Sequence, residues 1–401
     1  MELHGDLNRF NLWVNQFRYL HNLNDYLWFI LIILTGCFLI NVLIKRLKIN
    51  FFLGNFINFY HLSYTFFVVK YAETFAHDSN SIYSYAKGDV AAPIELKFQI
   101  LKGSEFLGVI LIPFARFLDL SILNLSLIFT FISSTALIYF YDIVTKINPK
   151  NKLNTLVCLF IIVLPSLNFF TSGITKECLT ISIFIYIFWN IINNKFFENK
   201  IVILILLIFL IFLRPYMGSI LFMYLSLSLF LSKRSIFSET RFKYLKYPLY
   251  AVFSLFALYF FSFSMDINNI FSLNNISEFI LNRQRLTMIG YSYNIVDTNI
   301  LFRILIYIFG PIFLLSSSIF ELFLVIENLI MFLLICLITF SILKNKFAIP
   351  KLNFEFYMMI LFSLTMIILL SNITANFGII ARSKYNFLLI IWVFIFYLNK
   401  K

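Results

Sequence analysis

The chain has 401 residues, of which 61% are hydrophobic and only 13% are charged, and its mean hydropathy is +0.89. Ordinary soluble domains are about 45–50% apolar and about 25% charged, so this composition excludes a soluble enzyme. The formal net charge of +13 does not indicate nucleic-acid binding. Most Lys and Arg residues lie in short clusters between apolar runs of about 17–22 residues, which is the length that crosses a bilayer.

Apolar runs in chain order predict an all-α, polytopic membrane protein with eleven transmembrane helices in a single transmembrane domain over residues 1–401. The predicted spans lie near 26–44, 51–69, 121–143, 153–171, 178–195, 199–214, 216–232, 247–265, 322–343, 354–372 and 385–398. Two further apolar stretches, 106–118 and 299–320, contain prolines and are predicted to be re-entrant or interfacial helices. Residues 1–25 are too polar for a signal peptide and predict a helix that lies in the membrane interface.

The basic residues also predict the orientation of the chain. Alternating crossings place 18 of the 32 Lys and Arg, and four of the 19 acidic residues, on one side of the membrane. That side has a net charge of about +14 and the other about −1, so the positive-inside rule makes the first side cytoplasmic. The N-terminus is then periplasmic and the C-terminus cytoplasmic. Eight of the 11 Arg fall on the periplasmic side, where their planar forks suit phosphate oxygens, although arginines at helix ends also snorkel and pair with carboxylates.

Two long polar connections, 70–120 and 266–300, are predicted to be periplasmic loops. The first contains Asp78 and Asp89 together with Tyr83 and Tyr85. Carboxylates just above a membrane, beside aromatic rings that can stack on sugars, suit a base that removes the proton of a hydroxyl nucleophile. The alternative, which composition alone favours, is a solvated loop whose acidic residues balance nearby lysines.

The connection between the fourth and fifth predicted spans contains Ser172-Gly173-Ile-Thr175-Lys176-Glu177. A structural interpretation exists, because Thr175 or Ser172 can cap the following helix and Glu177 suits its first turn. A functional interpretation also exists, since a Lys-Glu pair at the mouth of an apolar bundle is costly unless it is paired or used.

Several other cations lie at predicted outer helix ends or in outer loops, and they are candidates for binding an anionic lipid headgroup. They are Arg214 before Pro215, Arg283, Arg285, Arg303, Arg382 and Lys384. Glu327 is predicted to lie inside the hydrocarbon zone, where it would pair with an arginine or carry a proton. The four cysteines lack the paired spacing of a metal site, so no metal is predicted.

The layout of these motifs resembles the membrane glycosyltransferases of the GT-C kind. The resemblance rests on Asp78-x-x-x-x-Tyr83, a proline-containing re-entrant helix that ends at Arg116, Ser172-Gly173-x-x-Lys176-Glu177, and Arg214-Pro215. Within that superfamily, Gly310-Pro311, Glu327 and Asn376-x-Gly378-x-x-x-Arg382-x-Lys384-Tyr385 resemble the O-antigen or Wzy-type polysaccharide polymerases of Gram-negative bacteria.

The resemblance implies an inner-membrane enzyme without a cofactor that joins undecaprenyl-diphosphate-linked glycans on the periplasmic face, with a chain-length regulator as a further partner. It makes Asp78 the first candidate for the base, followed by Glu177 and Asp89, with Tyr83 and Tyr85 stacking on sugars. The implied diphosphate ligands are Lys176, Arg214, Arg283, Arg285, Arg303, Arg382 and Lys384.

Two other functions stay open. A GT-C transferase that adds one sugar from a polyprenyl phosphate would need the same carboxylate loop but fewer cations. A flippase for lipid-linked oligosaccharides would have charges deep within several spans and internal repeats. The sequence shows no repeat, and all four His residues fall in its first fifth, unlike the late-loop His of O-antigen ligases.

Overall fold

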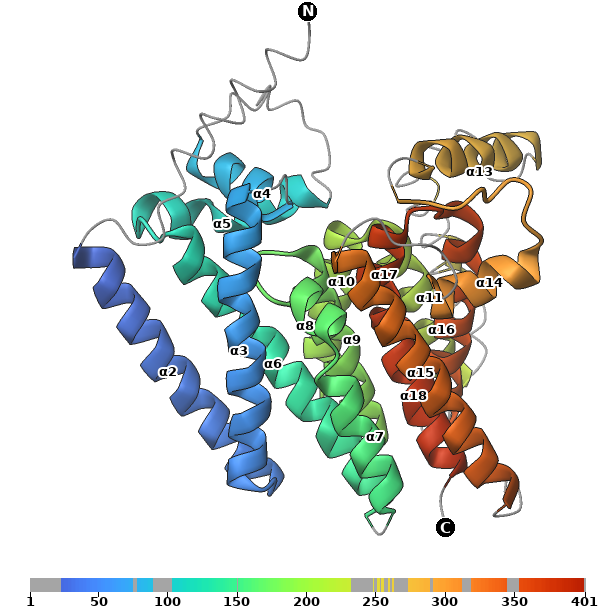
Figure 1. Cartoon of the computed structure of the whole chain (residues 1–401), viewed down its shortest axis with the longest axis horizontal. Coiled ribbons are helices and arrows are strands. Elements are labelled where there is room, and N and C mark those ends of the chain that lie inside the picture. Colours follow the sequence, from blue (N-terminus) through green and yellow to red (C-terminus); the bar gives the residue numbers. More distant parts are fainter. Residues whose placement is uncertain are drawn as a thin grey trace, which may run out of the picture. The chain divides into compact units, whose positions relative to one another are not determined.

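The computed structural model describes residues 23–74, 78–88, 103–149, 151–231, 273–288, 291–311, 319–344 and 353–399, and a few residues between 248 and 262. Within these ranges the regular elements are helices, and the only β-bridge pairs Ser292 with Asn376 (Figure 1). The predicted all-α class is confirmed for this part of the chain. The predicted interfacial segment 1–25, apart from its last three residues, and most of the predicted span 247–265 lie outside the described residues.

The helices form two compact units, Met1–Ile138 with Asn168–Ser182, and Tyr139–Leu167 with Ile183–Lys401. The first unit contains α2 (Leu23–Leu47), α3 (Phe51–Thr74), α4 (Asp78–Lys87), α5 (Ser104–Ile112) and the π-helical turn η1 (Pro113–Phe117). The second contains α7 (Lys152–Ile162), α10 (Lys200–Leu213), α11 (Pro215–Leu231), α13 (Leu273–Thr287), α14 (Ile300–Phe309), α15 (Ile319–Lys344), α16 (Phe354–Ile373), α17 (Phe377–Ser383) and α18 (Tyr385–Leu398). Parts of α6 (Ile122–Ile147), α8 (Pro165–Thr171) and α9 (Lys176–Ile192) belong to each unit.

Four described helices are long enough and apolar enough to cross a membrane, namely α2, α6, α16 and the Leu322–Lys344 part of α15. Two further spans exist if the bent pairs α7–α8 and α17–α18 each count as one. The chain is therefore a membrane-embedded protein with four to six candidate spans among the described residues. The larger number of eleven crossings stays a prediction, because α9, α10 and α11 are each shorter than 18 residues.

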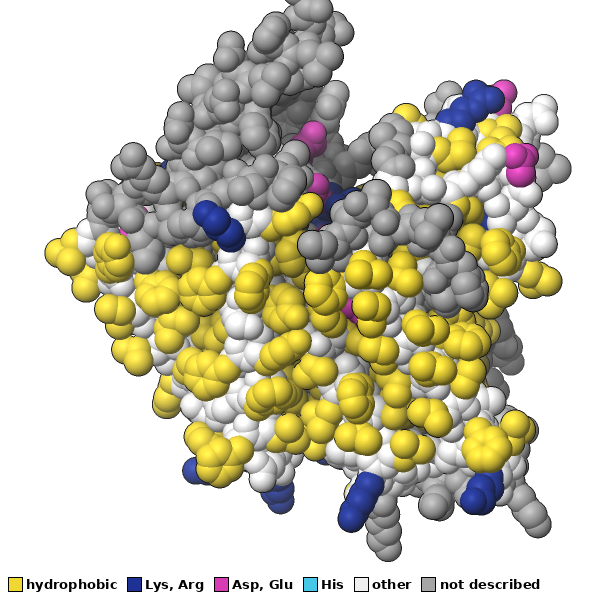
Figure 2. Space-filling model, viewed as in Figure 1, with side chains coloured by type: hydrophobic (Ala, Val, Ile, Leu, Met, Phe, Trp, Pro, Cys, Tyr) yellow, Lys and Arg dark blue, Asp and Glu magenta, His cyan; other side chains and the backbone are white. Residues whose placement is uncertain are grey.

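The side chains of these helices suit a bilayer. Figure 2 shows hydrophobic side chains over the flanks of the helices and Lys and Arg at helix ends. On α2 the apolar side chains are largely exposed, for example Leu34 at 64% and Phe38 at 66%, whereas most of α6 is buried. Exposed apolar side chains along a helix are favourable against lipid, so α2 has the surface of a lipid-facing helix and α6 that of a core helix.

One predicted span is broken, and a second bend lies directly before another predicted span, 385–398. The span predicted over 153–171 bends by 52° between α7 and α8, where Pro165 cannot donate the hydrogen bond that would continue α7. The second bend, of 51°, lies at Lys384 between α17 and α18 and involves no proline. A third break was predicted correctly, since α10 ends at Leu213 and α11 begins at Pro215.

The predicted loop 70–120 is largely helical where it is described. It contains the end of α3, all of α4, α5 and η1, and α4 packs against both α5 and η1 (Figure 1). Hydropathy does not reveal α4 because its composition is polar. Its buried residues, which include Ser79, Ile82 and Ala86, recur at helical spacing and face the neighbouring elements.

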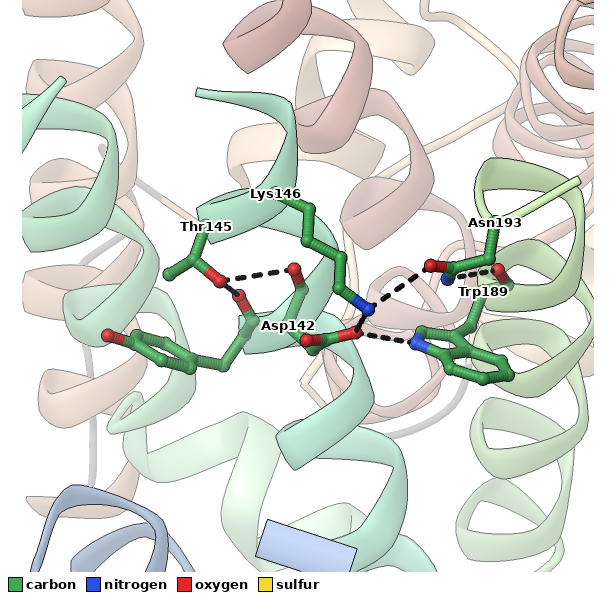
Figure 3. Close-up of polar contacts among 6 residues, drawn as sticks. Asp142, Thr145, Lys146, Trp189 and Asn193 are labelled. Carbon is green, nitrogen blue, oxygen red and sulfur yellow. Dashed lines mark hydrogen bonds and ion pairs between the residues drawn. The ribbon is translucent and has the colours of Figure 1, made fainter. Parts of the chain in front are cut away.

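A buried carboxylate anchors the lysine-bearing end of α6 to α9 within the second unit (Figure 3). Asp142 Oδ2 accepts hydrogen bonds from Lys146 Nζ at 2.6 Å and from Trp189 Nε1 at 2.7 Å. Lys146 Nζ also donates to Asn193 Oδ1 at 3.1 Å. Lys146 and Lys195 both lie over the Trp189 ring, with Nζ to centroid distances of 5.5 and 5.7 Å. The cluster fixes two helix ends with charge-assisted contacts.

Replacing Asp142 with Asn is expected to lower the free energy of unfolding by about 1.5–3 kcal/mol, because hydrogen bonds to a charged, buried group are lost. Chemical denaturation of the detergent-solubilised protein measures this change. The matched control is Glu198→Gln, at an exposed acidic residue of the same unit. Equal stability of the two variants would show that the Asp142 cluster contributes nothing beyond a solvated ion pair.

Side-chain amides hold the end of α18 to the rest of the second unit. Asn148 and Asn151 each donate to the carbonyl of Asn399 at 3.0 Å. The Asn399 side chain donates to Asn154 Oδ1 at 2.7 Å and accepts from Ser341 Oγ at 2.8 Å. These bonds join α18 to the connection between α6 and α7 and to α15, so the carbonyl at the helix end is satisfied by side chains.

Candidate active site

In the first unit, α4 carries Asp78 at its first position and is fixed at both ends. Arg116 Nε donates to the carbonyl of Ala86 at 2.7 Å and so satisfies an acceptor at the end of the helix. Lys87 pairs with Asp119 just beyond it. The start of α4 is held by Ser79, whose Oγ donates to the carbonyl of Ile174 at 3.0 Å. The backbone at Asp78 is therefore fixed by contacts distant in sequence.

The contact with Ile174 brings α4 to the turn that precedes α9. A second contact also ties this turn to α4. Lys176 Nζ donates to Ser104 Oγ at 2.9 Å, and Ser104 is the first residue of α5, which packs on α4. Glu177, in the first turn of α9, is only 2% exposed. Through these two hydrogen bonds the structure places side by side the two segments singled out in the sequence, the Asp78 segment and the Lys176-Glu177 turn.

Residues 172–175 form the turn before α9. Thr175 is the cap that was predicted, because its Oγ1 accepts a hydrogen bond from Cys178 N at 3.2 Å. Ser172 does not cap the helix, since its Oγ donates to the carbonyl of His61 at 3.3 Å. Gly173 has a φ of +80°, which favours glycine, and its N–H donates to Thr130 Oγ1 at 3.0 Å. The turn is therefore hydrogen-bonded to both α3 and α6.

Both tyrosines predicted to stack on sugars pack within the protein. Tyr83 OH donates to the carbonyl of Leu120 at 3.1 Å. The ring of Tyr85 lies against Gly108, where an added Cβ would be only 2.5 Å from Tyr85 Cδ1. They lie two positions apart on α4 and so point in different directions. Their contacts with sugars stay a prediction, and Asp89 lies outside the described residues.

The second unit contains a buried charged centre, formed by Ser166, Glu327, Asn328, Lys384 and Tyr385. Glu327 accepts hydrogen bonds from Ser166 N at 2.9 Å and from the hydroxyls of Ser166 and Tyr385. Lys384 donates to Asn328 Oδ1, and Asn328 Nδ2 donates to the carbonyl of Gly310 at 2.7 Å. Among the described residues, Asn328 is the only hydrogen-bond partner of the Lys384 ammonium. Each of the five residues is at most 4% exposed.

The buried charged centre lies where two bends of the second unit meet, the one between α7 and α8 and the one between α17 and α18. Ser166 follows the break between α7 and α8, and Lys384 forms the break between α17 and α18. Glu327 lies on the third turn of α15, roughly 12 Å along the helix from its first residue. Glu327 was predicted to pair with an arginine or to carry a proton. The structure gives it hydroxyl and amide donors in place of an arginine, with the charge of Lys384 close enough to interact, and proton transfer by Glu327 stays a prediction.

Arg214 lies near this centre within the second unit. Tyr307 OH lies 3.0 Å from Ser383 Oγ, next to Lys384 in the chain. Arg214 and Tyr216 are close enough to Tyr307 to interact with its hydroxyl electrostatically, and Arg214 Nη1 is 3.5 Å from Tyr216 OH. Arg214 is thus linked through Tyr307 to Ser383, the neighbour of Lys384 in the chain.

The other predicted cations of the second unit are placed differently. Arg303 is already bonded within the protein, from Nε to the carbonyl of Thr298 at 2.7 Å and from Nη1 to Asn372 Oδ1 at 3.0 Å. Arg283 and Arg285 are both exposed on α13, and Arg382 is half-buried on α17. Arg303 therefore fastens the loop before α14 to the end of α16, and its role as a phosphate ligand stays a prediction.

The sequence alone did not identify the uncharged side chains that hydrogen-bond the buried titratable residues Glu327, Lys384 and His61. Ser166, Asn328 and Asn168 are buried polar residues inside apolar segments, and each hydrogen-bonds a titratable side chain. Their polarity within predicted spans was the available signal, because a buried polar group needs a partner. Which partner it takes depends on helix packing, which hydropathy does not give.

Comparisons with known proteins give no match for this chain, whether with protein-family models, curated proteins or solved structures. Its function is therefore inferred from its side chains and their geometry.

Proposed function

We propose that the chain is a bacterial inner-membrane glycosyltransferase that polymerises polyprenyl-diphosphate-linked oligosaccharide repeat units into O-antigen or capsular polysaccharide. The observation that carries the proposal is the joining of Asp78 and Lys176-Glu177 in the first unit through Ser79–Ile174 and Lys176–Ser104. Glycosyl transfer to a hydroxyl uses a carboxylate that takes the hydroxyl proton and a cation that stabilises the leaving group, and these two segments supply one of each. The composition agrees, since lipid-linked substrates require an enzyme embedded in the membrane.

In the proposed reaction, the hydroxyl oxygen of the acceptor glycan attacks the anomeric carbon of the donor glycan. The bond between that carbon and the diphosphate oxygen breaks, and undecaprenyl diphosphate leaves with the bonding electrons. Asp78 takes the hydroxyl proton, and the ammonium of Lys176 stabilises negative charge on the departing diphosphate. No cofactor takes part in these steps. The second-unit cations named in the sequence stay predicted diphosphate ligands.

The proposal includes the predicted topology. The ends of α4 and α9 that carry Asp78 and Lys176 would face the periplasm, and the Lys146 end of α6 would face the cytoplasm. The clustering of lysine at the Asp142 anchor supports this orientation, because lysine-rich ends remain on the cytoplasmic side. With eleven crossings, the N-terminus would be periplasmic and the C-terminus cytoplasmic.

A second candidate function is transport of a lipid-linked oligosaccharide across the membrane. The buried charged centre favours it, because transporters often place charges where discontinuous helices meet. A third, the transfer of one sugar from a polyprenyl phosphate, would use the same Asp78 segment.

The test is reconstitution of the purified protein in liposomes with undecaprenyl-diphosphate-linked repeat units, followed by mass analysis of the glycans. Polymerisation predicts a ladder of products that differ by one repeat unit. Products one sugar longer, formed only when a polyprenyl-phosphate sugar is added, would identify the single-sugar transferase. Unchanged glycans that move between leaflets would identify the transporter and overturn the proposal.

Lys176→Met is expected to reduce the rate of ladder formation by about 10²–10³-fold, because a preorganised charge that stabilises the leaving group is removed. The rate is measured in the same liposomes at saturating substrate. Lys87→Met is the matched control. This lysine lies at the end of α4 opposite to Asp78, where it pairs with Asp119. Equal rates for the two variants would remove Lys176 from the proposed site.

A further inference from the structure

We infer that His61, a buried residue of α3, is a positioning residue that fixes the Lys176-Glu177 turn, and this inference rests on the proposed function. The imidazole contacts two other helical segments of the first unit. Its Nδ1 lies 2.7 Å from Asn168 Oδ1 on α8, and its Nε2 lies 2.7 Å from Ser133 Oγ on α6. The side chain is fully buried. One ring therefore bonds α6 to α8 and connects both to α3.

The hydrogen bonds assign a role to each ring nitrogen. Because Asn168 Oδ1 is an acceptor, Nδ1 carries the proton and donates, and Nε2 accepts the hydroxyl proton of Ser133. A neutral imidazole thus satisfies both partners at once. No apolar side chain of similar size can make either bond, so replacing His61 leaves two buried polar groups without this partner.

The hydrogen bonds continue from His61 to the turn. The backbone carbonyl of His61 accepts from Ser172 Oγ at 3.3 Å. One turn further along α3, Thr65 Oγ1 donates to Thr130 Oγ1 at 2.8 Å, and Thr130 Oγ1 accepts from Gly173 N at 3.0 Å. The bonds of His61 and Thr65 therefore hold the backbone of 168–173, which leads directly to Lys176.

Gly173 shows how closely the turn follows α3. An added Cβ would lie 3.1 Å from Val68 Cγ1, and the backbone is already at a positive φ. A displacement of α3 by a fraction of an ångström would thus move the turn. Small displacements of catalytic groups cost large factors in rate, since about 1 Å can cost about 10²-fold. His61 is placed to control the position of Lys176 without contacting the substrate.

The test combines a structural and a catalytic measurement on the full chain in lipid nanodiscs. His61→Leu is expected to speed amide hydrogen exchange over 172–178 about five- to tenfold, as for the loss of one or two hydrogen bonds. It is also expected to lower the turnover number for glycan transfer about 10–100-fold, with a smaller change in KM. His61→Asn and His61→Gln can each restore one of the two bonds, so each should recover part of both losses.

Asn55→Leu is the matched control, because Asn55 lies on the same helix but bonds to Asn41 of α2 at 2.9 Å. Ser133→Ala, which removes one hydroxyl, should give the same changes as His61→Leu in smaller amounts. Exchange over 172–178 that is unchanged in His61→Leu would overturn the inference, as would equal effects of His61→Leu and Asn55→Leu. A wild-type protein without transferase activity would overturn the proposed function, and the exchange measurement would still decide the role of His61.

Discussion

Replacing Asp78 with Asn is expected to lower the turnover number for glycan transfer by about 10²–10⁴-fold, the usual contribution of a positioned general base. Asn keeps the size of the side chain but cannot take the proton of the acceptor hydroxyl. The helix should remain in place, because the hydrogen bond from Ser79 to Ile174 and the bond from Arg116 to Ala86 do not involve the Asp78 side chain. The measurement is the initial rate of ladder formation in liposomes that contain lipid-linked repeat units.

The matched control for Asp78 is Asp119→Asn. Asp119 lies near the other end of α4, where it pairs with Lys87, and its side chain is 60% exposed. This variant should transfer glycans at the wild-type rate. Wild-type turnover by Asp78→Asn would remove this residue as the base and make Glu177 the next residue to replace, because the hydrogen bond from Ser79 to Ile174 brings the two segments together.

Replacing Glu327 with Ala is expected to lower the free energy of unfolding by about 3–5 kcal/mol. The carboxylate accepts bonds from Ser166 and Tyr385 and lies close enough to compensate the charge of Lys384. Its removal would leave buried donors unsatisfied and a buried ammonium without its counter-charge. Chemical denaturation in detergent, followed by loss of helical circular dichroism, measures the change.

A double variant separates the charge effect from the loss of packing. Combining Glu327→Gln with Lys384→Met removes both charges and keeps most of the volume, so it should be more stable than Glu327→Ala by about 2 kcal/mol or more. Glu278→Ala, at an exposed residue of α13 in the same unit, is the control and should change stability by less than about 0.5 kcal/mol. Equal stability of Glu327→Ala and this control would show that the buried charged centre is not held by its charges.

The long apolar helices could be predicted from the sequence because hydropathy alone determines them. The predicted spans 26–44, 322–343 and 354–372 fall within single helices of the structure, and 121–143 begins one residue before α6. The break at Pro165 was not predicted, since apolar residues continue on both sides of it. The helix α4 was also not predicted, because packing on α5 stabilises it rather than its own hydrophobicity.

The candidate site could be predicted only as residue types. Asp78 and Lys176-Glu177 were singled out because charged residues beside apolar spans are costly. Their joining depends on Ser79 and Ser104, whose partners lie 95 and 72 residues away in the chain. Such pairs arise from the packing of helices, and one sequence read alone contains no signal for them. His61 was overlooked for the same reason, since its two partners come from different helices.

The position of Asn399 has a consequence for the order in which the protein assembles. Every residue of the first unit precedes residue 183, so this unit can acquire its contacts while the second is still being synthesised. The second unit is different, because the connection between α6 and α7 waits for a residue made almost 250 positions later. Until Asn399 leaves the ribosome, the amides of Asn148, Asn151 and Asn154 lack this partner. Biogenesis of this part of the second unit therefore requires that α18 has been made.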